Sequence, residues 1–88
     1  PVLVKFHADW CGYCKVLAPT IETLAAEYDD RAAFVAVDVD EGKEIAGEYD
    51  VSGIPLVLVF ADGTVQSRIE GAQDAAAYRE ALDTAIAG

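Results

Sequence analysis

The sequence has few basic residues, and this shortage excludes several classes of partner. Only 6 Lys and Arg residues stand against 16 Asp and Glu residues in 88, which gives a formal net charge of −10. A protein with this charge repels phosphate backbones and anionic lipid head groups. Nucleic acids and anionic membrane surfaces are therefore not expected as partners.

Long apolar runs are also absent. The longest stretch without a charged residue covers eleven residues, 51–61, whereas a helix that crosses a bilayer needs about 20. No signal peptide, low-complexity tract or internal repeat is visible. The chain begins on Pro1 without an initiator Met, so we expect either a removed leader or a domain cut from a longer protein. We predict a cytoplasmic location, with a periplasmic or other extracytoplasmic one as the alternative if a leader was removed upstream.

Cysteine is scarce as well. The two cysteines, Cys11 and Cys14, are separated only by Gly12 and Tyr13, and a disulfide that closes so short a loop stabilises a fold little. The chain must therefore fold on its hydrophobic residues, which make up 53%, and the cysteine pair is free for chemistry. A structural zinc ion needs four ligands. Since only His7 could join the two thiols, we expect no metal site.

The hydrophobic pattern predicts four strands and three helices in the order β-α-β-α-β-β-α. We expect the strands over 2–7, 33–39, 56–60 and 65–70, and the helices over 12–28, 41–49 and from 75 onward. Ala75, Tyr78, Leu82 and Ile86 are the predicted buried stripe of the last helix. Asp62 and Gly63 are typical of a hairpin turn.

Two βα units favour parallel strands, to which the hairpin should add an antiparallel edge. The third strand is apolar at every position and is expected to be covered on both faces. These features predict an α/β fold with one domain over residues 1–88. Its four-stranded mixed sheet should be covered by three helices.

The chemically informative segment is 10–15, with the sequence WCGYCK. A thiol at a helix start faces unpaired N–H groups and the positive end of the helix dipole, which stabilise its thiolate. Cys11 is therefore the predicted exposed nucleophile, and Cys14, one turn further along, the predicted shielded thiol. In thiol–disulfide exchange, the first attacks a substrate disulfide and the second resolves the mixed disulfide.

Several separated motifs resemble the thioredoxin family over nearly the whole chain. Residues 6–15 resemble its active-site signature, and Pro19 lies where the family kinks its long helix. Residues 51–55 resemble the segment that holds the family's cis-proline, and Gly71 matches a glycine that borders the substrate groove. The resemblance implies a thioredoxin-like fold and disulfide oxidoreductase activity without a bound cofactor.

The resemblance also implies a substrate-binding surface. A cis bond before Pro55 would expose the backbone of Ile54, with which a substrate strand could pair. The residues implied to contact substrate are Trp10, Gly12, Tyr13, Ile54, Pro55 and Gly71.

The sequence departs from the family pattern in several places. The additional strand and helix with which the family's domain usually begins are missing, so the chain resembles a short form. Tyr13 replaces the proline of the usual Gly-Pro middle pair, which tunes redox poise in the family. Lys5 stands where the family has a buried acid beneath the second cysteine, and Ala36 replaces the lysine that pairs with this acid. His7 replaces an aromatic residue, and Glu70 an apolar one beside the groove.

Lys5 and His7 are the candidates for redox tuning. An ammonium near the thiols would favour the reduced state and make the pair more oxidising, whereas a neutral amine could accept the proton of Cys14. Alternatively, the Lys5 stem packs in the sheet and its head extends to the edge. His7 either titrates near the site or fills a core position. We predict a reduction potential above the roughly −270 mV of thioredoxin.

The predicted function is the reduction of protein disulfides through Cys11 and Cys14. Ile54 before the proline resembles reductases more than dedicated oxidases. One alternative is an oxidase or isomerase, which Tyr13 and Lys5 favour, and another is a non-catalytic interaction module. The expected partners are disulfide-containing proteins and an upstream reductase or thiol donor, and the chain is expected to be a monomer.

Overall fold

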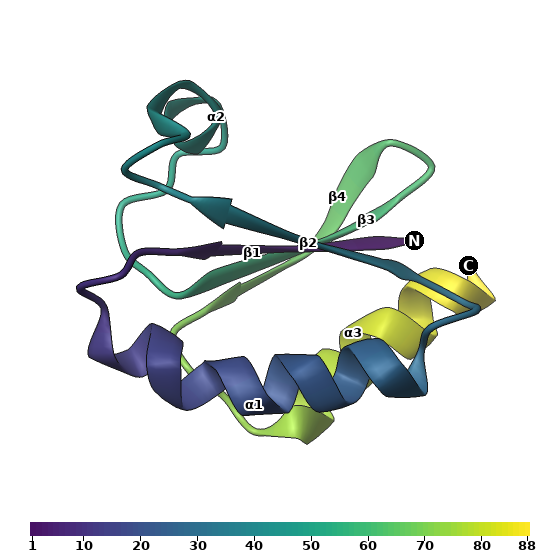
Figure 1. The fold of residues 1–88 in the computed structure, drawn as a ribbon. Coiled ribbons are helices and arrows are strands. Elements are labelled where there is room, and N and C mark those ends of the chain that lie inside the picture. Colours follow the sequence, from purple (N-terminus) through teal and green to yellow (C-terminus); the bar gives the residue numbers. More distant parts are fainter.

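The computed structural model describes residues 1–88 and contains the seven predicted elements in the predicted order. The strands are β1 (Val2–His7), β2 (Ala33–Asp38), β3 (Leu56–Ala61) and β4 (Thr64–Glu70), and the helices are α1 (Gly12–Glu27), α2 (Lys43–Glu48) and α3 (Ala75–Ala87). Figure 1 shows the sheet edge-on, with α1 and α3 covering one face and α2 lying over the other. The mixed sheet of four strands with three helices confirms the predicted fold class.

The strand order is β2-β1-β3-β4. β1 and β2 are parallel, but β3 is antiparallel to β1 and β4 is antiparallel to β3. The expectation that antiparallel pairing is confined to the hairpin edge is therefore wrong. The six residues of α2 advance the chain by about 9 Å, less than the roughly 20 Å of a six-residue strand. The chain consequently re-enters the sheet at the end where β2 left it (Figure 1).

The main core lies between the sheet and the helices α1 and α3. Its largest fully buried side chains include Leu3, Leu17, Leu24, Tyr78 and Leu82. β3 is central and buried at five of its six positions, which confirms that it is covered on both faces. The packing fixes the N-terminus of α1 against the end of β1.

The buried stripe of α3 differs from the prediction. Ala81 and Ala85 are buried beside Tyr78 and Leu82, whereas Ile86 is exposed. Four residues of α-helix turn through about 400°, so each step of four drifts by about 40° around the axis. Two steps of four, from Tyr78 to Leu82 and on to Ile86, therefore carry Ile86 off the inner face. A step of three from Leu82 places Ala85 on the inner face instead.

Two polar contacts join α1 to α3. The Tyr28 hydroxyl donates a hydrogen bond to Oδ1 of Asp83 over 2.7 Å. The Arg79 guanidinium donates two hydrogen bonds to the Glu27 carboxylate, of 3.0 and 2.7 Å. The hydrogen bond with Arg79 lowers the pKa of Glu27. Burial, followed by the contact with Asp83, raises the pKa of Tyr28. Both contacts hold the long α1 helix against α3.

Candidate active site

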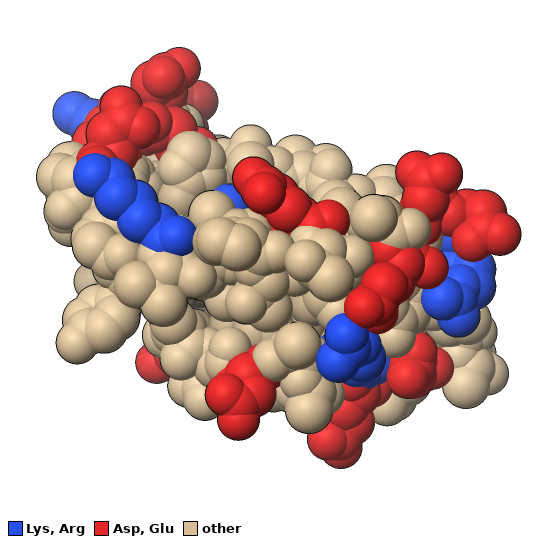
Figure 2. All heavy atoms as spheres, turned by 60° about the horizontal axis from the view of Figure 1, so that its bottom comes forward, with Lys and Arg blue, Asp and Glu red and all other residues tan.

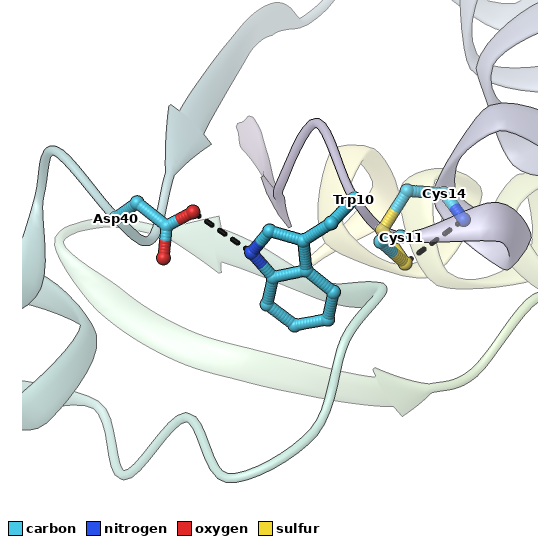
Figure 3. Close-up of a disulfide and its surroundings, with 4 residues drawn as sticks. All are labelled: Trp10, Cys11, Cys14 and Asp40. Atoms are coloured by element: carbon cyan, nitrogen blue, oxygen red, sulfur yellow. Dashed lines mark hydrogen bonds between the residues drawn. A yellow bond between two sulfur atoms is a disulfide. The ribbon is translucent and has the colours of Figure 1, made fainter.

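The two cysteines lie where β1 ends and α1 begins. Cys11 occupies the N-cap position with extended backbone angles, φ −87° and ψ 108°, and is joined to Cys14 by a disulfide. The Sγ atom of Cys11 accepts a hydrogen bond from the backbone N–H of Cys14 over 3.1 Å (Figure 3). The structure therefore shows the oxidised form, in which a helix N–H group already points at the first sulfur.

The predicted difference in exposure between the cysteines is not present in this oxidised form. Cys11 is 6% exposed and Cys14 4%, and both pack in a small cluster with Ala8, against which Val39 and Ile54 lie. Packing against Ala8, Val39 and Ile54 covers Cys11 as well as Cys14. An exposed Cys11 in the dithiol form stays a prediction.

A groove opens beside this cluster. It has a volume of about 430 Å³ and is lined by Trp10, Val39, Val51, Ser52, Gly53 and Ile54. Trp10 is 68% exposed, and its indole N–H donates a 2.8 Å hydrogen bond to Oδ2 of Asp40 (Figure 3). The sequence alone assigned Asp40 no role at the site. Its contact with Trp10, 30 positions away, had no local sequence signal.

The Ile54–Pro55 peptide bond is cis, as the family resemblance implied. Pro55 is buried, and neither backbone group of Ile54 takes part in a hydrogen bond within the chain. An N–H and a C=O without a partner in the chain are open to pairing by a further strand. Since Ile54 also packs against the cysteine cluster, a strand bound there would lie next to the disulfide.

Gly71 lies behind the cis-proline and is not part of the groove lining. Its N–H donates a 2.9 Å hydrogen bond to the Pro55 carbonyl, and its carbonyl accepts one of 3.2 Å from the buried Tyr78 hydroxyl. The same hydroxyl accepts a hydrogen bond from the N–H of Gln73 over 3.1 Å. Gly71 thus connects the proline segment to Tyr78 of α3. No pattern in the sequence indicated that the Tyr78 hydroxyl makes this contact.

Arg68 also contributes to the site, although no pattern in the sequence indicated this. Its guanidinium donates hydrogen bonds to the carbonyls of Tyr49 and Asp50, of 2.7 and 2.8 Å. These carbonyls directly precede the segment that lines the groove. Arg68 therefore ties the start of that segment to β4.

The remaining predicted contact residues are open to solvent. Tyr13 is 72% exposed, and a Cβ placed on Gly12 would meet nothing within 4 Å. The surface over the first turn of α1 is therefore free of chain contacts that would block an approaching partner.

Lys5 and His7 line a separate cavity of about 360 Å³. The other lining residues are Ala8, Asp9, Cys14, Lys15 and Ala18. The structure therefore brings both candidate tuning residues to the second cysteine and keeps them apart from the groove at Trp10 and Ile54.

No group of three or more His, Cys, Asp or Glu side chains is placed to hold a metal ion. None of the helices combines the length and the apolar character that crossing a membrane requires.

Comparisons with known proteins agree with this geometry. A thioredoxin from Staphylococcus aureus (strain Mu50 / ATCC 700699) is 43% identical over 81 residues, which cover 92% of this chain and 78% of the relative. A mutant thioredoxin from Halobacterium salinarum NRC-1 superposes with a TM-score of 0.89 at 41% identity, over 97% of this chain and 74% of that one. The oxidised form of mitochondrial thioredoxin 3 from Saccharomyces cerevisiae gives a TM-score of 0.86 at 34% identity, over 94% and 76%. A model of the thioredoxin family matches residues 1–84. The chain therefore belongs to the thioredoxin family and is a thiol–disulfide oxidoreductase of the protein-disulfide reductase type.

Proposed function

We propose that the protein reduces disulfides of other proteins with Cys11 as the nucleophile and Cys14 as the resolving thiol. The observation that carries this assignment is the hydrogen bond from the Cys14 N–H to the Cys11 sulfur at the start of α1. A donor that points at sulfur stabilises a thiolate more than a thiol, and the helix dipole acts in the same direction. Cys11 is thus the sulfur that the fold prepares for attack.

The reaction consists of two exchanges. The Cys11 thiolate attacks one sulfur of the substrate disulfide, and the other substrate sulfur leaves as a thiolate and takes up a proton. The Cys14 thiolate then attacks Cys11, which releases the second substrate sulfur and forms the Cys11–Cys14 disulfide. Two electrons pass to the substrate, and the protein ends in the oxidised form seen in the structure.

The groove and the cis-proline segment form the proposed binding surface for an extended substrate strand. The backbone of Ile54 would pair with the strand, while Trp10 and Tyr13 offer exposed aromatic surface on either side of Cys11 along the sequence. Gly12 leaves space above the disulfide. Pro55 and Gly71, which are joined by a hydrogen bond, would hold Ile54 in place at the margin of this surface.

The oxidised protein must be reduced before each new turnover. We expect an upstream reductase of the thioredoxin-reductase type, or a small thiol donor, to supply two electrons to the disulfide. The reaction requires no further group, and we propose that residues 1–88 act as one domain and as a monomer, without a bound cofactor.

Insulin reduction in the presence of dithiothreitol tests the proposal. The wild-type protein should accelerate insulin precipitation, and Cys11→Ser should abolish the acceleration because no thiolate attacks the substrate. Ala26→Ser is the matched control, since it places a serine on the exposed, far half of α1, and it should retain full activity. Unchanged activity of Cys11→Ser would contradict the assignment.

A further inference from the structure

Both ends of the segment that lines the groove are held from the end of β4. At the start of the segment, the Arg68 guanidinium donates hydrogen bonds of 2.7 and 2.8 Å to the carbonyls of Tyr49 and Asp50. At its end, the N–H of Gly71, directly after β4, donates one of 2.9 Å to the Pro55 carbonyl. Arg68 and Gly71 are close together in the chain, so one short stretch fixes the segment at both ends.

The chain between these two anchors has few hydrogen bonds of its own. The Val51 N–H donates one of 2.9 Å to the Ala46 carbonyl of α2. The residues that follow, Ser52, Gly53 and Ile54, form no backbone hydrogen bond within the chain, and the first two are exposed. Exposed backbone without hydrogen bonds changes its dihedral angles easily. The conformation in which Ile54 meets a substrate strand therefore depends on the anchors at either end.

Asp50 is the residue at which the chain turns from α2 into this segment. Its φ of 54° lies in the left-handed region, which is unfavourable for a residue with a side chain. Tyr49, directly before it, is anchored by its ring, which packs edge-on against Phe60 with 5.6 Å between the ring centroids. Asp50 itself is exposed, so packing does little to fix it. By binding both carbonyls, Arg68 ties the unfavourable turn to its anchored neighbour.

Arg68 reaches the two carbonyls from the face of the sheet over which α2 lies. It is paired in register with Leu58 of β3, and paired residues of neighbouring strands point to the same face. Leu58 belongs to the cluster against which Tyr49 packs. Oε1 of Glu70 lies 3.6 Å from Nε of Arg68, so all three guanidinium nitrogens face an acceptor. A guanidinium can serve separate acceptors in this way because it is a rigid fork of donors, whereas lysine has a single nitrogen.

Arg68 can influence the reaction only through other residues, because it neither lines the groove nor packs with the cysteines. We propose that Arg68 is a positioning residue, which holds residues 51–54 in the conformation that pairs with a substrate strand. When only a fraction of the molecules has the binding conformation, the apparent dissociation constant rises by the inverse of that fraction. Arg68 therefore tightens the binding of substrates that pair with Ile54. The inference rests on the proposed function, in which Ile54 pairs with the substrate.

Steady-state reduction of a peptide disulfide tests this role. The probe consists of two peptide strands joined by one disulfide, with a fluorophore on one strand and a quencher on the other, and dithiothreitol returns the protein to its dithiol form. Arg68→Met should raise KM for this probe about fivefold and leave kcat near the wild-type value, because fewer molecules hold the segment ready. The small disulfide 5,5′-dithiobis(2-nitrobenzoate) offers no strand to Ile54, so its reaction with the prereduced protein should change less than about twofold.

Two further variants separate the fork of donors from the charge. Arg31→Met removes the same charge from a guanidinium that also donates to a carbonyl at a helix end, that of Glu27. Since Arg31 follows the far end of α1, this variant should change KM less than about twofold. Arg68→Lys keeps the charge but lacks the fork, and its KM should lie between those of the wild type and Arg68→Met.

Amide hydrogen exchange tests the positioning without any substrate. The Val51 N–H is the last hydrogen-bonded group before the unpaired residues of the segment. In Arg68→Met it should exchange about tenfold faster, because local opening becomes easier when an anchor is lost. Arg31→Met should leave the exchange of Val51 at the wild-type rate.

The outcomes separate this inference from the function on which it rests. Activity of Cys11→Ser on the peptide disulfide would contradict the proposed function, whatever the Arg68 variants show. With Cys11→Ser inactive, an unchanged KM or Val51 exchange in Arg68→Met, or an equal rise of KM in Arg31→Met, would overturn the role of Arg68. The role would also be overturned if Arg68→Met slowed the peptide and the small disulfide equally, or if Arg68→Lys matched the wild type.

Discussion

At the residue scale, the backbone of Gly71 connects the cis-proline segment, the proposed substrate-binding segment, to the rest of the fold. Its φ of +75° lies in the left-handed region, where a side chain costs about 1–2 kcal/mol. In this conformation its N–H reaches the Pro55 carbonyl and its carbonyl reaches the Tyr78 hydroxyl. The backbone angles at this position therefore favour glycine. Steric crowding does not exclude a side chain, since the nearest atom to an added Cβ lies at 3.7 Å.

Gly71→Ala should lower the free energy of unfolding by about 1–2 kcal/mol because of this backbone strain. The control is Gly47→Ala in the last turn of α2, where an added Cβ meets nothing within 4 Å. Alanine favours helix over glycine, so this change should raise the free energy of unfolding by about 0.5–1 kcal/mol. Urea unfolding of both variants checks the opposite signs, and an equal shift in the two would contradict the role given to the φ angle.

At the element scale, the contact between Glu27 and Arg79 makes the packing of α1 against α3 sensitive to pH. The hydrogen bond from Arg79 holds the pKa of the Glu27 carboxyl below its ordinary value. A group with a lowered pKa in the folded state stabilises the fold above its unfolded pKa, and this contribution disappears as the pH falls through the folded pKa. The stabilisation from Glu27 is therefore present at neutral pH and lost in acid.

Glu27→Gln should accordingly be less stable than the wild type at neutral pH, and the difference should vanish in acid, once the pH has fallen below the lowered pKa of Glu27 in the folded protein. The contact is exposed to solvent, so the loss at neutral pH should be small. Glu22→Gln is the matched control on α1, since Glu22 has no hydrogen-bond or ion-pair partner. The free energy of unfolding measured across this pH range tests the prediction, which fails if both variants show the same pH dependence.

For the whole molecule, local patterns in the sequence were sufficient to predict most of the architecture. Hydrophobic periodicity and turn residues located all seven elements, because these signals arise within a few residues of one another. Asp62 and Gly63 both have positive φ, of 52° and 76°, as their local turn chemistry requires. The family resemblance added the cis bond before Pro55, which no periodicity would reveal.

The features that the sequence could not reveal depend on contacts between distant segments. The direction of β3 follows from how far α2 carries the chain, and the contact of Trp10 with Asp40 depends on where β2 ends beside β1. The sequence pattern placed Tyr78 in an apolar stripe and indicated no partner for its hydroxyl. Only the folded chain brings this hydroxyl to Gly71. The low exposure of Cys11 arises where Val39 and Ile54, both distant in sequence, pack against the cysteines.

The acidic charge of the molecule should influence which substrates it reduces. Acidic side chains outnumber basic ones over the face in Figure 2, the net charge is −10, and Asp40 lies beside Trp10 at the groove. Such a field accelerates encounters with cationic partners, and salt screens it.

A lysine-rich disulfide peptide should therefore be reduced roughly tenfold faster than a glutamate-rich one of equal length at about 0.01 M salt. The two rates should converge near 1 M salt, where the Debye length is about 3 Å. Stopped-flow rates at both salt concentrations provide the measurement. Equal rates at low salt would show that the surface charge does not select substrates.

In the proposed reaction Cys11 attacks the substrate, and Cys14 resolves the mixed disulfide. The most direct test is mass spectrometry of the single-cysteine variants after incubation with a disulfide-containing protein such as insulin. Cys14→Ser should accumulate a covalent adduct with a substrate chain through Cys11, and dithiothreitol should release it. Cys11→Ser should form far less adduct under the same conditions. An adduct that forms equally well with Cys11→Ser, or none with Cys14→Ser, would contradict these roles of the two cysteines.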